Sequence, residues 1–271
     1  MSELLLGKEV KYNISYDPAI LFPISRSQNR NLLGKNLSFN GVDVWNCYEV
    51  SWLDKNEKPE VRILEIYIPA NSPNTIESKS LKVYFNSINN HKFESAEKAL
   101  GAINADIAKI VGSKITSIFR ELEFFDKKEF KNFEASCIDN NSIERSALKP
   151  SAKILKIESQ EYIEENLYSN LLKSNCLITS QPDWASVLIS YKGAKIDHSS
   201  LLSYIISYRN HSEFHEHCVE RIYEDIMQAC SPNDLLVYAR YTRRGGIDIN
   251  PIRSSSEIQD IENLNFRLAR Q

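Results

Sequence analysis

An internal repeat restricts the fold of this chain more than any other feature of its sequence. Residues 80–91 read S-L-K-V-Y-F-N-S-I-N-N-H, and residues 200–211 read S-L-L-S-Y-I-I-S-Y-R-N-H. At a constant offset of 120 residues, six of the twelve positions are identical. Self-similarity at a fixed separation indicates that one supersecondary unit occurs twice. At 271 residues, the chain is long enough for two domains of about 130 residues each.

The elements predicted around the repeat follow a similar order in both halves. In the first half, strands are predicted over residues 42–52 and 61–69 as a hairpin, from alternation and β-branched content. A helix capped by Ser78 or Ser80 and ending near residue 90, a helix over 93–111 and a strand over 114–125 follow. In the second half, we predict strands over 152–157, 176–179, 184–192 and 235–241, and helices over 199–208 and from about residue 214. The fold class is therefore α+β, as a tandem duplication of one β-β-α-α-β unit.

The boundary between the two copies is predicted within a polar segment. Residues 126–150 are charged, contain several asparagines and end at Pro150, which is typical of an inter-domain linker. We therefore divide the chain into a first module over residues 1–145 and a second over residues 146–271.

Charge and composition exclude several classes of protein. The net charge of −3 and the pI near 6.0 give no basic field for nucleic acid or a membrane surface. No apolar run approaches the ~18 residues of a membrane span, and the first residues do not resemble a signal peptide. The five cysteines form no C-x-x-C pair, which favours reduced thiols in the cytoplasm. The sequence also has no G-x-G-x-x-G and no P-loop, so a nucleotide cofactor would bind by other means.

One candidate reaction centre is the segment S-N-C-L-I-T-S-Q-P-D-W at residues 174–184. Pro182 is expected to end the strand predicted over 176–179, so the chain turns before Asp183. Cys176 and Asp183 would then face each other across a pocket as nucleophile and proton donor. The alternative is structural, because a free cysteine is commonly a small buried hydrophobe.

Three further polar clusters are candidates, each with a simpler interpretation. His215 and Glu216 begin the last long helix and could bind a heterocycle, or form a solvated first helical turn. Residues 77–80 (E-S-K-S) begin an earlier helix and could simply cap it, with their charges in solvent. Residues 243–246 (R-R-G-G) suit phosphate, because guanidinium groups bind oxyanions, or form a solvated turn.

A zinc site is an alternative use of the same region. His215 and Cys218 are three residues apart on the predicted helix, His217 is adjacent, and Cys176 could complete the ligand set. Cys218, however, falls on the apolar stripe with Val219, which favours a core position. We therefore predict no metal.

Four of these segments together resemble the signature motifs of a known family. They are E-S-K-S-L-K-V-Y at residues 77–84, S-N-C-L-I-T-S-Q-P-D-W at 174–184, F-H-E-H-C-V-E-R-I-Y-E-D-I at 214–226 and Y-T-R-R-G-G-I-D-I-N-P at 241–251. Their order and spacing resemble the longer, two-module members of the NADPH-dependent 7-cyano-7-deazaguanine reductases, the QueF nitrile reductases of queuosine biosynthesis. The resemblance covers nearly the whole chain and is weakest between about residues 126 and 170.

The resemblance implies a fold and a mechanism. The fold would be the tunnelling fold, in which each module is an antiparallel sheet carrying two helices. Cys176 would add to the nitrile carbon and form a covalent thioimide, and Asp183 would donate a proton to the nitrile-derived nitrogen. Two NADPH would reduce 7-cyano-7-deazaguanine (preQ0) to the 7-aminomethyl compound (preQ1), a precursor for tRNA modification.

The resemblance also implies binding residues and an assembly. The substrate would contact Ile76, Glu77, Ser78, His215 and Glu216, and NADPH would contact Ser78, Lys79, Arg244 and Gly245. Because these residues come from both copies, the site would form between modules or between subunits, and the family suggests a homodimer. Two other classes remain: a zinc-dependent cyclohydrolase or hydrolase on the same fold, and a non-catalytic pterin- or purine-binding protein.

Overall fold

The computed structural model describes residues 15–34, 38–125, 129–143 and 149–271. The chain forms two compact units. Unit 1 comprises Met1–Asn29, Asp43–Glu129 and Arg243–Ile249, and unit 2 comprises Arg30–Val42, Phe130–Thr242 and Asn250–Gln271. Each unit thus includes a segment from the other half of the sequence. The predicted division between residues 145 and 146 instead assigns each half of the sequence to a single module, without these two segments.

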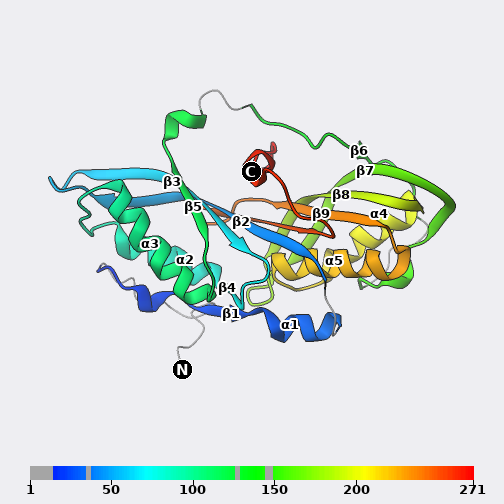
Figure 1. Ribbon diagram of the computed structural model, residues 1–271, viewed down its shortest axis with the longest axis horizontal. Coiled ribbons are helices and arrows are strands. Elements are labelled where there is room, and N and C mark those ends of the chain that lie inside the picture. The colour runs from blue at the N-terminus through cyan, green and yellow to red at the C-terminus, as the bar shows by residue number, and fades with distance from the viewer. Residues whose placement is uncertain (1–14, 35–37, 126–128, 144–148) are drawn as a thin grey trace. The chain divides into compact units, whose positions relative to one another are not determined.

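Unit 1 is a sheet with two helices on one face (Figure 1). Strand β5 pairs antiparallel with β3, and β2 lies on the other side of β3. A small second sheet pairs β1 with β4. The elements are β1 Pro23–Ser25, β2 Asn40–Leu53, β3 Pro59–Pro69, β4 Asn74–Ile76, α2 Ser78–Ile88, α3 Ala96–Val111 and β5 Thr116–Arg120. Helix α1 Arg26–Leu33 and strand β2 each have residues in both units.

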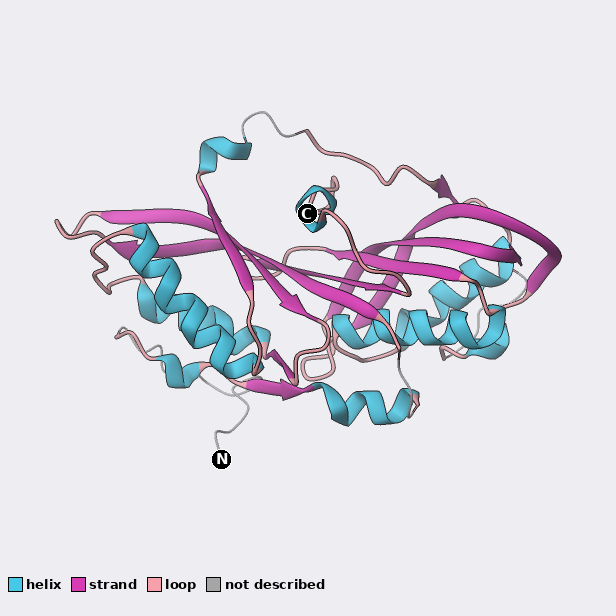
Figure 2. Cartoon of the chain, in the orientation of Figure 1, coloured by secondary structure: helices cyan, strands magenta, loops and turns pink. Residues whose placement is uncertain are grey.

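Unit 2 has the same design (Figure 2). Strands β7, β8, β9 and β10 form an antiparallel series, and α4 and α5 cover one face of it. The two-residue β6 pairs parallel with β7, so this sheet is not wholly antiparallel. The elements are β6 Ser136–Cys137, β7 Ile157–Asn175, β8 Pro182–Ile196, α4 His198–Ile206, α5 His215–Cys230, β9 Asp234–Tyr241, β10 Ile247–Ser254 and α6 Ile261–Leu264. The first three residues of β10 belong to unit 1.

Each unit has its own hydrophobic core between sheet and helices. In unit 1, Trp45 and Trp52 of β2 pack with Leu81 of α2 and Ile103 of α3. The second core is formed mainly by side chains of β8 and β9 against α4 and α5, among them Val187, Val237, Leu201, Ile222 and Ile226. The apolar face of each helix is thus buried against its own sheet, which is where most helical stability arises.

The predicted duplication is confirmed by matching hydrogen bonds in the two units. Helices α2 and α4 begin 120 residues apart, and α3 and α5 both have 16 residues. Tyr84 of α2 donates its hydroxyl to Asp106 of α3 at 2.7 Å, and Tyr204 of α4 donates to Asp225 of α5 at the same distance. The α+β fold class is therefore correct, with a sheet and two helices in each unit.

Several predicted boundaries are wrong. Glu77, rather than Ser78 or Ser80, caps α2, and residues 152–154 form a 3-10 helix instead of a strand. Residues 176–179 form a turn, so the predicted strand at Cys176 does not exist. The predicted linker contains β6, and the strand predicted over 114–125 ends at Arg120. Among the described residues, no helix is long and apolar enough to cross a bilayer.

Candidate active site

Cys176 lies on the turn that joins β7 to β8. Its backbone N–H donates to the Gln181 carbonyl at 2.8 Å, and the Ser180 N–H donates to the Cys176 carbonyl at 3.0 Å. Ser180 has a left-handed φ of 55°, and Pro182 begins β8 instead of ending the preceding strand. These contacts fix the backbone of Cys176 at the end of β7 and leave its side chain half-buried.

Asp183 is buried in the same unit and faces a histidine. Ser174 of β7 pairs with Asp183 of β8, so the carboxyl lies beside the strand that leads to Cys176. The Asp183 side chain is 4% exposed, and its Oδ2 lies 3.4 Å from Nε2 of His215, which is 14% exposed. The structure thus brings together a carboxyl and an imidazole at the end of the hairpin that carries the thiol.

The remaining cysteines differ from Cys176 in their environment. Burial raises the pKa of the Cys47 thiol and of the Cys218 thiol well above the ordinary value, and it raises that of Cys230 to about 11. These three are therefore neutral thiols near pH 7, which are poor nucleophiles. Cys137 is exposed and lies on the short strand β6.

The start of α5 is buried, so its interpretation as a solvated helical turn is wrong. Glu216 is 3% exposed and His217 is fully buried. Phe214 occupies the N-cap position and makes no side-chain cap hydrogen bond. His215 lies at the first helical position, with its ring stacked on Tyr241 at a centroid distance of 3.7 Å and an interplanar angle of 0°.

The zinc alternative has no geometric support in the described part of the chain. No three metal-ligating side chains of His, Cys, Asp or Glu come together among the residues that the structure describes. Cys218 packs in the core of unit 2, as its place on the apolar stripe predicted.

The E-S-K-S segment of unit 1 begins helix α2. The Glu77 carboxylate accepts from the backbone N–H groups of Lys79 and Ser80, at 2.9 and 2.7 Å, and is buried. Ile76 packs in the core of unit 1. Glu77 therefore caps the helix, as the capping alternative expected, but its carboxylate is buried and not in solvent. Ser78 and Lys79 form the first turn of the helix.

The R-R-G-G segment forms a tight turn in unit 1. Arg244 donates its N–H to the Ile247 carbonyl at 2.9 Å, and Gly245 and Gly246 have φ of 56° and 75°. Positive φ at both central residues defines a type I′ turn, which favours glycine. A Cβ on Gly246 would lie 2.4 Å from the Glu49 carboxyl carbon, so a side chain at this position would require the end of the Glu49 side chain to move.

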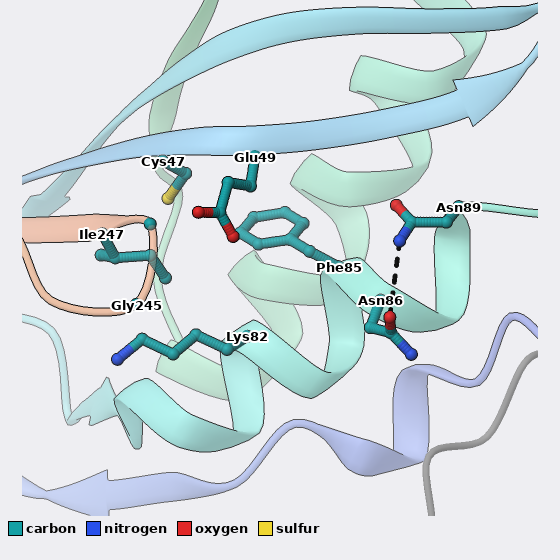
Figure 3. A pocket seen from close by; sticks show the side chains of 9 residues that line it. Cys47, Glu49, Lys82, Phe85, Asn86, Asn89, Gly245 and Ile247 are labelled. Carbon is teal, nitrogen blue, oxygen red and sulfur yellow. Dashed lines mark hydrogen bonds between the residues drawn. The ribbon is translucent and has the colours of Figure 1, made fainter.

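A cavity of about 230 Å³ lies beside this turn (Figure 3). Lys82 of α2 projects below the turn, Glu49 of β2 lies on the other side, and Asn86 and Asn89 lie further along. The lining residues are Cys47, Glu49, Lys82, Phe85, Asn86, Asn89, Gly245, Gly246 and Ile247. Sequence reasoning found Gly245 but missed Lys82 and Glu49. The available signal was the spacing of Lys82, which lies three residues after Lys79 and therefore on the same helical face.

Comparisons with known proteins match both halves of the chain. The family model described as "Nitrile reductase, 7-cyano-7-deazaguanine-reductase N-term" matches residues 12–119, and the "QueF-like protein" model matches residues 182–260. A crystal structure of the archaeosine synthase QueF-Like in the apo form covers 37% of this chain and 100% of its own, with a TM-score of 0.32 and 19% identity. That likeness is too weak to bear on fold or function.

Curated relatives match over nearly the full length. The NADPH-dependent 7-cyano-7-deazaguanine reductase of Paraburkholderia phymatum is 46% identical over 269 residues, which is 98% of this chain and 97% of the relative. The protein of the same name from Bordetella avium is 47% identical over 258 residues, or 94% of each chain. With the duplicated α+β fold and both family models in place, the chain belongs to the family of NADPH-dependent 7-cyano-7-deazaguanine reductases.

Proposed function

We propose that this chain reduces the nitrile of 7-cyano-7-deazaguanine to the aminomethyl group of 7-aminomethyl-7-deazaguanine, with Cys176 as nucleophile and Asp183 as proton donor. The observation that carries the proposal is the β7–β8 hairpin. It holds a half-buried thiol at its turn and a buried carboxyl, paired with an imidazole, just beyond the turn. A nitrile is a modest electrophile and needs a strong nucleophile, and cysteine is a strong one among side chains.

The proposed steps balance in atoms and charge. Cys176 Sγ bonds to the nitrile carbon while the thiol proton reaches the nitrogen by way of Asp183, which gives a thioimide without reduction. Two molecules of NADPH, bound in succession, would each supply one hydride, one for each reduction of the carbon. After the first reduction Asp183 protonates the nitrogen. The C–S bond then breaks as one N–H proton passes to the departing sulfur, which re-forms the Cys176 thiol and leaves an imine in the site for the second reduction. Protonation accompanying the second reduction gives the amine, so two hydrides and two protons are consumed.

Substrate binding is proposed for residues of both copies. In unit 2, the buried Glu216 carboxylate suits the N–H groups of a guanine-like ring, and His215 borders the same region. In unit 1, Ile76, Glu77 and Ser78 form the second set of contacts. The Glu77 carboxylate already accepts two helix N–H groups, so Glu77 holds the backbone of this segment in place.

NADPH binding is proposed at the start of α2 and at the glycine turn. Ser78, Lys79, Arg244 and Gly245 would hold the cofactor, and the cationic side chains suit its phosphates. The fit rests on the cavity beside Gly245, where the turn carries no side chain to fill the space and Lys82 adds a third cation. We include Lys82 among the proposed cofactor contacts.

Mass spectrometry of the intact protein tests the proposed chemistry. The protein is incubated with 7-cyano-7-deazaguanine in the absence of NADPH, and we expect an added mass equal to the whole substrate. Cys176→Ala should show no adduct, whereas Cys137→Ala, which removes an exposed cysteine, should form it normally. Substrate binding without any added mass in the unmodified protein would refute the covalent mechanism.

The wider context is also part of the proposal. A chain that makes 7-aminomethyl-7-deazaguanine would serve queuosine synthesis for tRNA modification in the cytoplasm, acting on the free base and contacting neither nucleic acid nor membrane. We propose a homodimer. Light scattering should then give twice the chain mass of 31.2 kDa, and a mass of 31.2 kDa under assay conditions would refute it.

A further inference from the structure

Tyr241 is a buried residue with an unusual contact to the proposed site. It is the last residue of β9, and no part of it is exposed. Its ring lies parallel to the His215 imidazole, with the centroids 3.7 Å apart. Aromatic pairs usually adopt offset or tilted arrangements with their centroids further apart. The two rings here are parallel and in direct face-to-face contact.

The backbone of Tyr241 is held in unit 2 by two hydrogen bonds and by strand pairing. Its N–H donates to Asn250 Oδ1 at 3.2 Å, and its carbonyl accepts from Gln271 Nε2 at 3.0 Å. It pairs with Ala185 of β8, two residues beyond Asp183. The β8–β9 ladder therefore sets the distance between the tyrosine ring and the Asp183 carboxyl.

The Tyr241 side chain is also neutral near pH 7. Burial, followed by the neighbouring Cys218 and Asp183, raises the pKa of Tyr241 well above its ordinary value. The phenol therefore keeps its proton near pH 7, and the contact that Tyr241 makes with His215 is made by its ring.

His215 depends on such a contact for its orientation. The torsion that rotates an imidazole about its Cβ–Cγ bond is broad, so packing or hydrogen bonds must fix it. Nδ1 of His215 is buried and has no hydrogen-bond partner among the described residues, and Nε2 faces Asp183 at 3.4 Å. The Tyr241 ring, stacked on the imidazole at 3.7 Å, restricts this rotation.

We infer that Tyr241 is a positioning residue for the proposed reaction: its ring holds the His215 imidazole with Nε2 facing the Asp183 carboxyl. The inference rests on the proposed function, in which Asp183 delivers protons to nitrogen at more than one step and must be reloaded between them. Asp183 is almost fully buried, and the more exposed His215 is the titratable neighbour placed to return a proton to it. A rotated imidazole would lose that geometry.

Two substitutions of Tyr241 separate its ring from its hydroxyl. Tyr241→Phe keeps the stacked ring, and kcat should stay within about twofold of the wild type. Tyr241→Leu removes the ring, and kcat should fall by about 10- to 100-fold, as for other small misplacements of reacting groups. Tyr204→Leu is the matched control, because Tyr204 is equally buried in unit 2 but packs against Tyr208. It should lower stability without a comparable loss of kcat.

An NMR measurement reports the stack directly. The ring C–H signals of His215, assigned by their loss in His215→Gln, should be shifted upfield by the tyrosine ring in the wild type and in Tyr241→Phe. They should return to ordinary positions in Tyr241→Leu. A wild-type spectrum without that shift, a folded Tyr241→Leu with normal kcat, or a Tyr241→Phe as impaired as Tyr241→Leu would each overturn the inference. If the wild type forms no Cys176 adduct, the proposed function fails instead.

Discussion

The two hairpin turns at equivalent places in units 1 and 2 share several backbone features, but the turn of unit 2 is one residue longer and the side chains differ in chemistry. In unit 1, the Asp54 N–H donates to the Lys58 carbonyl at 2.9 Å, as the Cys176 N–H donates to Gln181 at 2.8 Å in unit 2. Each turn has one non-glycine residue with positive φ, Glu57 or Ser180. Each is followed by a proline that begins the next strand, β3 or β8. Asp54 thus occupies in unit 1 the place of Cys176 in unit 2.

The side chains of the two turns make different contacts. The Asp54 carboxylate accepts from the N–H groups of Asn56 and Lys58, at 2.7 and 2.9 Å, which stabilises its own turn. The acid after the proline is Glu60 in unit 1, and it is partly exposed and paired with Arg62. Its counterpart Asp183 is buried beside His215. The turn of unit 1 is thus stabilised locally by its own Asp54 side chain, whereas the turn of unit 2 carries a thiol at that place and a buried acid after the proline.

The largest effect is expected from replacing Asp183, the buried acid of the unit 2 hairpin. Asp183→Asn should lower kcat by about 10²- to 10⁴-fold, because an amide cannot serve as the proposed proton donor. Substrate binding, measured by calorimetry, should change little. Glu60→Gln at the equivalent place in unit 1 should leave kcat unchanged. Full activity in Asp183→Asn would remove the proposed distinction between the two hairpins.

The second prediction concerns a buried charge in α5 that α3 lacks. Glu220 is fully buried and pairs with Arg253 at 2.8 Å and with Arg30 at 2.6 Å. At the equivalent place in α3, 119 residues earlier, the residue is Gly101. Glu220→Gln removes the charge that compensates two arginines, and we expect unit 2 to lose about 3–5 kcal/mol of unfolding free energy. Urea denaturation measures this loss, and a change below about 1 kcal/mol would contradict it.

The same glutamate predicts a dependence of stability on pH. Burial alone would raise the pKa of Glu220, but Arg253 and Arg30 together lower it from 4.5 to about 2. Because the folded pKa lies below the unfolded one, this stabilisation is complete above about pH 4.5 and is lost as the pH falls toward 2. The stability difference between wild type and Glu220→Gln should therefore shrink across that range in acid titrations followed by denaturation.

The third prediction concerns the cavity of unit 1 that we propose for the cofactor. Lys82 lines it, whereas the residue at the same place in α4, 120 residues later, is Leu202 in the core. Lys82→Gln should raise the KM for NADPH by about 10- to 160-fold, since one charge-assisted hydrogen bond contributes about 1.5–3 kcal/mol, and leave kcat nearly unchanged. Lys98→Gln, on the exposed side of α3, is the matched control. An unchanged KM would exclude Lys82 from the cofactor site.

Local patterns predicted the duplication and most helices, but not the hairpin that carries Cys176. Periodicity and the repeat placed α2–α5 within a few residues, because their apolar faces recur at helical spacing. Strand β7 was missed because charged side chains interrupt its alternation, and its first half is largely exposed. The contact of Asp183 with His215 joins a strand to a helix 32 residues later, and no local pattern encodes it. Tyr241 was missed for the same reason. Lys82 was missed although its spacing from Lys79 places both side chains on one face of the helix.

The smallest effect is expected at Gly101 of α3, the place that Glu220 occupies in α5. A Cβ on this exposed helical glycine would meet no atom within 4 Å, and its φ is ordinary. Gly101→Ala should therefore raise the unfolding free energy by roughly 0.5–1 kcal/mol, because alanine loses less backbone entropy in a helix. Gly112 is the opposing control: it caps α3 with a φ of 71°, and its Cβ would lie 3.3 Å from Pro73. Gly112→Ala should lower stability in the same urea assay, and equal shifts in both variants would show that backbone conformation does not decide the outcome.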